Sequence, residues 1–251
     1  MRGDPHLSFA RGGRADFRGR NGRYYNFLSA PGLALNVKTE DSTFTLHEGA
    51  LTVEGSFITE VHLAAIVGGS RRKWANVSFW ASELNEFNTG WHVVNGTCGA
   101  GAPFALGMGD ARSCGELAID VSFASVSLQI RNWTVVARGN HVYGHVAGPT
   151  HRIDLDLKAR GNAPSTLPHG MLGQSFSTKG TRRGKIDLYP EKGRFRTSAM
   201  AEGAIEGTPA QYEVATPYAT RFAFSRFGGS EVASLEEEPH MGPFDSFGDD
   251  A

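Results

Sequence analysis

The sequence predicts an all-β protein with an antiparallel, β-sandwich-like fold and few short helices. Two observations support this prediction. Apolar residues alternate with polar ones over many short stretches, and glycine- or asparagine-containing pairs separate those stretches. Alternation with a period of two gives a strand one face toward a core and one toward water, as in antiparallel sheets. Many short strands separated by turn residues are typical of sandwiches and barrels.

The alternating stretches extend along most of the chain. The clearest is 151–158, where Ile153, Leu155 and Leu157 alternate with charged residues. The same pattern occurs at 33–37, 44–46, 117–123, 126–130 and 222–224. In the third of these it assigns Phe123 to the core face. The expected turns lie at Gly12-Gly13, Asn21-Gly22, Gly68-Gly69, Asn95-Gly96, Gly139-Asn140 and Gly161-Asn162.

Composition and charge indicate one β domain followed by a tail. The chain has 251 residues, of which 40% are hydrophobic and 20% charged, and its formal net charge is −1. That balance gives no general attraction to nucleic acid or to an anionic membrane, so neither is expected as a partner. After Arg226 there are acidic residues but no Lys or Arg. We therefore predict a β domain over 1–228 and an acidic, disordered tail over 229–251.

The cysteines and possible glycan acceptors bear on the compartment. Cys98 and Cys114 flank a glycine-rich stretch, and the chain has no other cysteine. Such a pair predicts one disulfide that closes a surface loop, and two buried free thiols are the alternative. Asn-x-Ser/Thr sequences place candidate glycosylation sites at Asn76, Asn95 and Asn132. Together these features favour an extracellular or cell-surface protein.

The sequence contains neither a membrane span nor a signal peptide. No stretch approaches the roughly 18 consecutive apolar residues that cross a bilayer. Met1 leads directly into polar sequence, without the apolar segment of a signal peptide. Two interpretations remain: a cytosolic protein, or a fragment whose targeting segment lies upstream. The cysteine pair and the acceptor sequences favour the fragment.

Three motifs resemble the von Willebrand factor type D module. They are Gly3-Asp4-Pro5-His6, then Phe17-Arg18-Gly19 with Tyr25-Asn26-Phe27 and Val37-Lys38 in the next strand, and finally His169-Gly170-Met171-Leu172-Gly173-Gln174. The third is closest to the form in plant root-cap-type relatives. Their order and spacing match the family over about residues 3–190. The resemblance implies a non-catalytic extracellular or cell-surface module for adhesion, matrix assembly or protein interaction.

The chain departs from that family at two places. The family pairs a cysteine after its Tyr-x-Phe strand with one in its Gly-Leu-Cys-Gly segment, whereas here the corresponding positions hold Leu28-Ser29-Ala30 and Leu172. We expect an apolar contact to replace that bridge. The family's calcium ligands follow the third motif, but residues 175–183 contain no carboxylate. Because a hard cation needs several oxygen ligands, we expect no calcium and no other cofactor.

Asp4-Pro5 is the one bond for which the sequence suggests a specific reaction. The Asp4 carboxylate can attack its own peptide carbonyl, since the tertiary proline nitrogen is a readily protonated leaving group. His6 would supply the proton as a general acid. Some type D modules self-cleave at this bond, so a self-processing domain is an alternative function. The competing interpretation is that Asp4 caps a turn and Pro5 fixes the backbone before the first strand.

Other candidate chemistries have less support. His141 and His145 share a strand face and His151 follows, but no metal-ligand spacing accompanies them, so no metal site is expected. No Gly-x-Ser-x-Gly elbow, paired carboxylates or Ser-His-Asp order defines an enzyme active site. We therefore predict a non-enzyme, and an unrecognised hydrolase is a further alternative.

A run of arginines near the N-terminus suggests a partner class. It comprises Arg11, Arg14, Arg18, Arg20 and Arg23, interleaved with glycines. Taken alone this composition is typical of an RNA-binding arm. The run coincides with the second motif, so its arginines are expected on ordered turns. A protein or an anionic glycan is therefore the expected partner.

Overall fold

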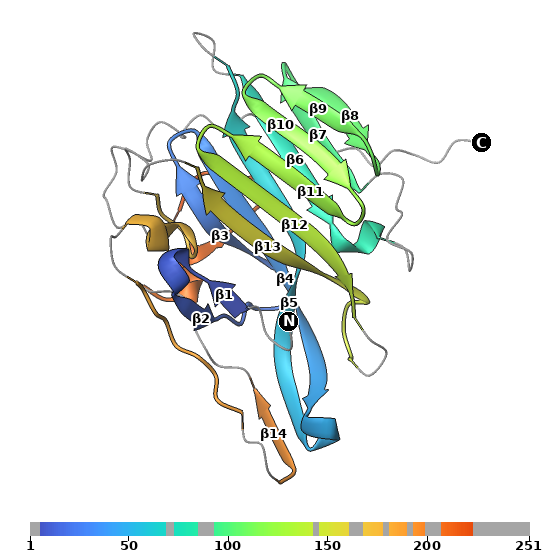
Figure 1. Ribbon diagram of the computed structural model, residues 1–251, viewed down its shortest axis with the longest axis vertical. Coiled ribbons are helices and arrows are strands. Elements are labelled where there is room, and N and C mark those ends of the chain that lie inside the picture. Colours follow the sequence, from blue (N-terminus) through green and yellow to red (C-terminus); the bar gives the residue numbers. More distant parts are fainter. Residues whose placement is uncertain are drawn as a thin grey trace, which may run out of the picture.

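A computed structural model describes residues 6–68, 73–84, 93–142, 146–160, 168–177, 181–189, 193–198 and 207–222. In these ranges the chain forms a large and a small sheet that pack face to face, with a separate two-stranded hairpin (Figure 1). All helices among the described residues are short 3₁₀ turns. The prediction of an all-β, antiparallel, sandwich-like fold is therefore confirmed.

The large sheet has eight strands and one parallel pair. Its order is β15-β3-β4-β5-β6-β7-β8, and β14 pairs in parallel with the first part of β5. Its strands are β3 (Arg23–Ala30), β4 (Leu33–Leu46), β5 (Leu51–Ile66), β6 (Trp74–Trp80), β7 (Val94–Gly99), β8 (Ala102–Leu106), β14 (Phe195–Ser198) and β15 (Glu213–Val214). All pairs except β14–β5 are antiparallel.

The small sheet has five antiparallel strands in the order β13-β12-β11-β10-β9. They are β9 (Ala111–Cys114), β10 (Leu117–Ser122), β11 (Ser125–Ile130), β12 (Trp133–His141) and β13 (His151–Ala159). The separate hairpin consists of β1 (His6–Ser8) and β2 (Arg14–Asp16). The 3₁₀ turns are η1 (Ala10–Gly12), η2 (His47–Gly49), η3 (Ala81–Glu83), η4 (Gly173–Ser177) and η5 (Pro209–Tyr212).

The core lies between the two sheets. Alternate residues of each strand enter it, for example Val61 and Leu63 from β5 and Leu117 and Ile119 from β10, all in one buried cluster. Strand residues between these positions face away from the core, which is the alternation that the sequence shows. The period-two pattern of the sequence therefore predicts both the strands and the side chains that face the core.

Three contacts join the sheets at one end of the sandwich. A disulfide links Cys98 of β7 to Cys114 of β9, with a Cα–Cα distance of 5.6 Å. Gly115 approaches the backbone of Val67 so closely that a β-carbon would overlap the Val67 carbonyl. Arg131, in the turn between β11 and β12, donates hydrogen bonds to the carbonyls of Pro31 (2.6 Å) and Ile66 (2.9 Å). We call this the closed end.

The disulfide has a larger structural role than the sequence predicts. The sequence predicts a bridge that closes a surface loop. The bridge instead crosses between the two sheets, and Cys114 is fully buried. The alternative of two free thiols is wrong.

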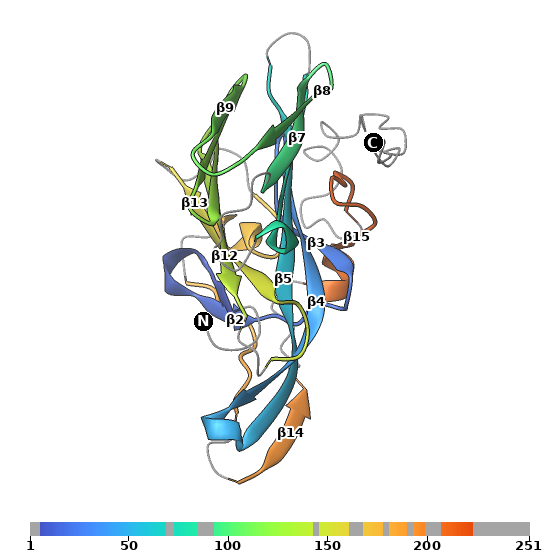
Figure 2. The ribbon, with the colours of Figure 1, turned by 90° about the vertical axis from the view of Figure 1, so that its right-hand side faces the viewer.

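The opposite end carries a projecting arm, formed by residues 39–58 of β4, η2 and β5 (Figure 2). The arm begins at a register shift between Lys38 and Thr39. A second apolar cluster packs along it: Phe44, Leu51, Val53, Phe57 and Val142. β14 lies beside β5 on this arm. Leu188, in the segment that precedes β14, is 92% exposed.

Three details of the predicted pattern are wrong. Asn95-Gly96 and Gly139-Asn140 are not turns but lie inside β7 and β12. Gly96 is required there because a β-carbon would overlap the Phe104 ring, and a β-carbon on Gly139 would overlap Leu84. Phe123 is not in the core: the β10–β11 turn leaves it 61% exposed. Asn21-Gly22 is a turn, as predicted, with Gly22 at φ 69°.

The predicted domain boundary lies outside the described residues. The last described residue is Phe222, so both the division at 228 and the acidic tail over 229–251 remain predictions.

Candidate functional site

The outward face of the large sheet is polar but buried. Asn36 of β4, His62 of β5 and Ser78 of β6 are neighbours in the register and point away from the core. Such positions normally face water. Yet Asn36 is fully buried, His62 is 2% exposed and Ser78 is 1% exposed. A further segment therefore covers this face, which we call the polar face.

The covering segment consists of residues 207–222, which we call the strap. It begins near η5, pairs with β3 through β15 and then crosses the polar face. In Figure 2 it lies on the side of β3 and β4 that faces away from the small sheet. The strap thus forms a third, irregular layer over part of the sandwich.

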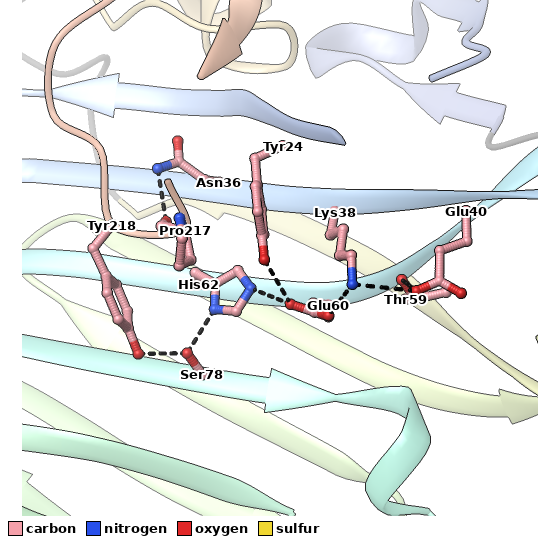
Figure 3. A network of polar contacts seen from close by, with 10 residues as sticks. All are labelled: Tyr24, Asn36, Lys38, Glu40, Thr59, Glu60, His62, Ser78, Pro217 and Tyr218. Carbon is pink, nitrogen blue, oxygen red and sulfur yellow. Dashed lines mark hydrogen bonds and ion pairs between the residues drawn. The ribbon is translucent and has the colours of Figure 1, made fainter. Parts of the chain in front are cut away.

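His62 connects the sheet to the strap through a chain of hydrogen bonds (Figure 3). Its Nε2 lies 2.9 Å from Glu60 Oε2, and its Nδ1 lies 2.6 Å from Ser78 Oγ. The Ser78 hydroxyl also contacts the Tyr218 hydroxyl of the strap. An ionised carboxylate only accepts, so Nε2 of neutral His62 carries the proton and Nδ1 accepts from Ser78. Ser78 then accepts from Tyr218, and every group in the chain is satisfied.

Charged side chains continue the network on the other side of Glu60. Lys38 Nζ lies 2.7 Å from Glu60 Oε1 and 3.4 Å from Glu40 Oε1. The Tyr24 hydroxyl donates to Glu60 Oε2 at 3.4 Å. Glu60 therefore receives donors from three neighbouring strands, β3, β4 and β5, which fixes its carboxylate.

The surroundings shift the pKa values of the network in consistent directions. Burial lowers the pKa of His62 below its ordinary 6.5, and the hydrogen bond to Glu60 only partly opposes this. Burial alone would raise the pKa of Glu60, but hydrogen bonds from His62 and Lys38 outweigh it and hold that pKa below 4.5. Burial raises the pKa of Tyr218. At neutral pH the network therefore contains an ionised Glu60 and a neutral His62.

Asn36 binds the main chain of the strap. Its carbonyl oxygen accepts from Asn26 Nδ2 at 2.9 Å, which sets the orientation of its amide. The amide nitrogen then donates to the carbonyls of Pro217 and Ala219, each at 2.9 Å. Contacts to main-chain carbonyls hold a segment in place whatever its side chains are. Pro217 lies in a turn closed by a hydrogen bond from Ala219 N to Thr216 O, so the polar face carries a means of holding the backbone of a turn.

The first part of the strap is held by other contacts. Tyr212 is buried and stacks on His169, with ring centroids 5.5 Å apart. Glu213 forms ion pairs with Arg20 and with Arg23, the latter at 3.7 Å. Two arginines of the predicted cluster thus pair with an acidic residue of the strap.

Ser78, His62 and Glu60 have the order of a nucleophile, a base and an orienting carboxylate. The same arrangement activates serine in hydrolases. Here Ser78 is buried beneath Tyr218. β6 pairs with β5 on one side and β7 on the other, so the backbone N–H groups beside Ser78 are committed to the sheet. A substrate carbonyl therefore has neither access to Ser78 nor backbone donors beside it in this conformation.

The three predicted glycosylation sites differ in exposure. Asn132 is exposed in the β11–β12 turn, and Asn95 is half-buried in β7. Asn76 is 3% exposed, and the serine of its acceptor sequence is Ser78 of the polar network. Burial at Asn76 disfavours a glycan there in the folded chain. Glycosylation at Asn76, Asn95 and Asn132 stays a prediction.

Two of the three motifs meet in the structure. The third motif lies against β3: Ser29 and His169 form a bridge, and Leu172 N donates to the Phe27 carbonyl at 2.9 Å. Leu28 and Leu172, which occupy the positions of the family's cysteines, are both buried in the main core. Tyr25 pairs with Val37 of the next strand. These contacts explain why the second and third motifs lie together, and membership of the family stays a prediction.

The first motif cannot be placed. Asp4 and Pro5 lie outside the described residues, as does the side chain of His6, although His6 begins β1. Self-cleavage at Asp4-Pro5 therefore stays a prediction.

The histidines do not gather into a metal site in the described part of the chain. His141 and His151 pack edge to face with ring centroids 5.3 Å apart, while His145 lies outside the described residues. Across the described ranges, no three His, Cys, Asp or Glu side chains are close enough to hold a metal ion. None of the helices found there has the length and apolar character required to cross a bilayer.

Comparison with known proteins gave no match, either among family models or among curated proteins.

One pattern in the sequence coincides with this site. Polar residues alternate on one side of three successive strands, at Asn36 and Lys38, Glu60 and His62, and Asn76 and Ser78. Alternation alone assigns such residues to water. The strap that covers them has no strand periodicity, and its contacts join residues up to 193 positions apart.

Proposed function

We propose that this chain is a non-catalytic, extracellular interaction module that binds a turn-forming polypeptide segment on its polar face. The observation that supports this is the seating of the strap. Asn36 donates to two carbonyls of the strap, and Ser78 contacts the Tyr218 side chain. Backbone contacts supply affinity and a side-chain pocket supplies selectivity, which is how many peptide-binding modules work. The disulfide supports an extracellular location, because such bonds persist in oxidising compartments.

A labelled peptide with the sequence of residues 207–222 tests this proposal. The full chain carrying Tyr218→Ala keeps the polar face intact but weakens its own strap. The tethered strap competes at a high effective concentration, so the peptide should bind the variant at least about tenfold more tightly than the wild-type chain. Fluorescence anisotropy measures both affinities.

Two controls make the result specific. A peptide carrying Tyr218→Phe loses only the hydroxyl that reaches Ser78, and should bind about fivefold more weakly. A chain carrying Asn36→Leu together with Tyr218→Ala, checked for native circular dichroism, should lose most of the binding. Equal binding of both peptides to both variants would reject the proposal.

The geometry around Ser78 favours a hydrolase as a second candidate function. Ser78, His62 and Glu60 are hydrogen-bonded in the order of a nucleophile, a base and an orienting carboxylate. Displacement of the strap would uncover the Ser78 hydroxyl. A fluorophosphonate probe should then label the Tyr218→Ala chain at Ser78, and Ser78→Ala should abolish the label. Absence of labelling in the Tyr218→Ala chain would reject this candidate.

Self-processing at Asp4-Pro5 can be tested independently. The chain is held at pH 5–6 for several days and its mass is followed. Cleavage between Asp4 and Pro5 would support self-processing, and an intact chain would exclude it.

A further inference from the structure

We propose that the strap exchanges between molecules, so that residues 213–219 of one copy lie on the polar face of a second copy. This inference rests on the proposed function and names the partner of that site. The partner is another molecule of this chain.

The contacts themselves identify this partner. Glu213 pairs with Arg20 and Arg23, two carbonyls of the strap accept from Asn36, and the Tyr218 hydroxyl reaches Ser78. These contacts are spaced along one short segment and match the polar face in charge, backbone register and side chain. A strap from a second copy satisfies all of them without any new complementarity.

The attachment of the strap favours exchange over a fixed position. Only Tyr212 and Val214 bring large buried apolar side chains to the sandwich, and β15 contains two residues. Tyr218 is half-buried, and its contact to Ser78 is a hydrogen bond. Polar contacts of this kind contribute about 1 kcal/mol each, so release of the whole strap, with its two apolar anchors, costs less than global unfolding.

The chain that leads into the strap is long enough to reach a neighbour. Residues 199–206 join β14 to the strap, and a stretch of that length spans at most about 30 Å when extended. In a reciprocal exchange each strap lies on the polar face of the other molecule. Both polar faces are then covered, and the result is a closed dimer. Because each strap makes the same contacts in either arrangement, protein concentration decides between them.

A complementation experiment tests the exchange. One full-length variant carries Asn36→Leu, which damages the polar face and leaves the strap intact. The other carries Tyr218→Ala, which damages the strap and leaves the face intact. Each variant alone lacks one half of the contact, but a mixture contains one intact pair. We expect the mixture to contain at least about fivefold more dimer than either variant alone, measured by native mass spectrometry with one variant labelled with ¹⁵N.

The control is a chain that carries both substitutions, mixed with wild-type chain, which should give no such increase. Circular dichroism confirms that all variants fold. If the strap peptide binds the Tyr218→Ala chain but the mixture forms no additional dimer, exchange is rejected and the proposed function stands. If the peptide does not bind either, both are rejected.

Discussion

His62 is a titratable residue that is only 2% exposed, because it lies between the large sheet and the strap. Tyr24, Trp80 and Tyr218 each pack edge to face against its ring, with centroids 5.6 to 6.2 Å away. Protonation reverses its hydrogen bonding to Ser78, because Nδ1 then becomes a donor. Ser78 must then donate to Tyr218, whose own proton loses its acceptor. The protonation state of His62 is therefore coupled to the seating of the strap.

This coupling predicts that acid destabilises the folded chain. The pKa of His62 is lower in the folded chain than its ordinary 6.5, so the unfolded chain binds a proton more readily. The contribution of neutral His62 to the free energy of unfolding therefore has its full value above pH 6.5. It decreases as the pH falls below 6.5. Glu60, whose folded pKa is below 4.5, adds a further loss in stronger acid. Urea unfolding between pH 5 and 8 measures the change.

Substitution of His62 separates its contribution. In His62→Gln the free energy of unfolding should vary less between pH 5 and 7 than in the wild type. His47→Asn, at an exposed position with φ 51°, where asparagine is well tolerated, serves as the control and should keep the wild-type dependence. Identical pH profiles for His62→Gln and wild type would contradict the assignment.

At the scale of elements, Gly96 and Gly139 lie inside strands at positions where other groups approach the backbone closely. Gly96 of β7 lies beneath the Phe104 ring of β8 and beside the Asn76 carbonyl of β6. Gly96→Ala should destabilise the chain by about 1–3 kcal/mol, because neither neighbour can move without disturbing the sheet. Thermal unfolding measures the loss.

A glycine in open space provides the comparison. Gly49 has φ 87° and nothing near its missing β-carbon, so Gly49→Ala should cost only the roughly 1–2 kcal/mol of backbone strain. Replacing Phe104 by Leu should relieve only part of the Gly96→Ala loss, because the Asn76 carbonyl stays in place, and should not relieve the Gly49→Ala loss. No relief at all would show that the Phe104 ring is not an obstacle.

The same elements show what the sequence can and cannot predict. Period-two patterns predict strands such as β10 and β13 because each strand has one face toward the core. They fail at Asn95-Gly96, because a turn-forming pair and a close packing site have the same composition. They also fail for the polar network, since nothing near His62 in the sequence indicates that the strap will cover it. The pairing of Cys98 with Cys114 follows from their number, but the crossing between sheets does not.

At the scale of the whole molecule, the two sheets share the main core and are cross-linked by one disulfide. The loop closed by Cys98 and Cys114 has a sequence separation of 16. Removing the bridge with Cys98→Ala and Cys114→Ala together should lower the free energy of unfolding by about 3 kcal/mol. Denaturant unfolding of the variant and of the reduced wild type should agree.

The bridge also offers a test of the compartment. Non-reducing peptide mapping of protein from its native source should recover the Cys98–Cys114 peptide pair. Recovery of two alkylated thiols instead would contradict the extracellular assignment in the proposed function.

The cross-sheet bridge has a consequence for a molecule placed under tension. When a folded chain is pulled from its two termini, the stretch between bridged cysteines cannot lengthen, even after both sheets have separated. With a sequence separation of 16, the withheld length is about 55 Å at full extension. After unfolding under force, the contour length of an oxidised molecule should therefore be shorter than that of a reduced molecule by that amount. The redox state of this bond thus changes how far each molecule extends under load.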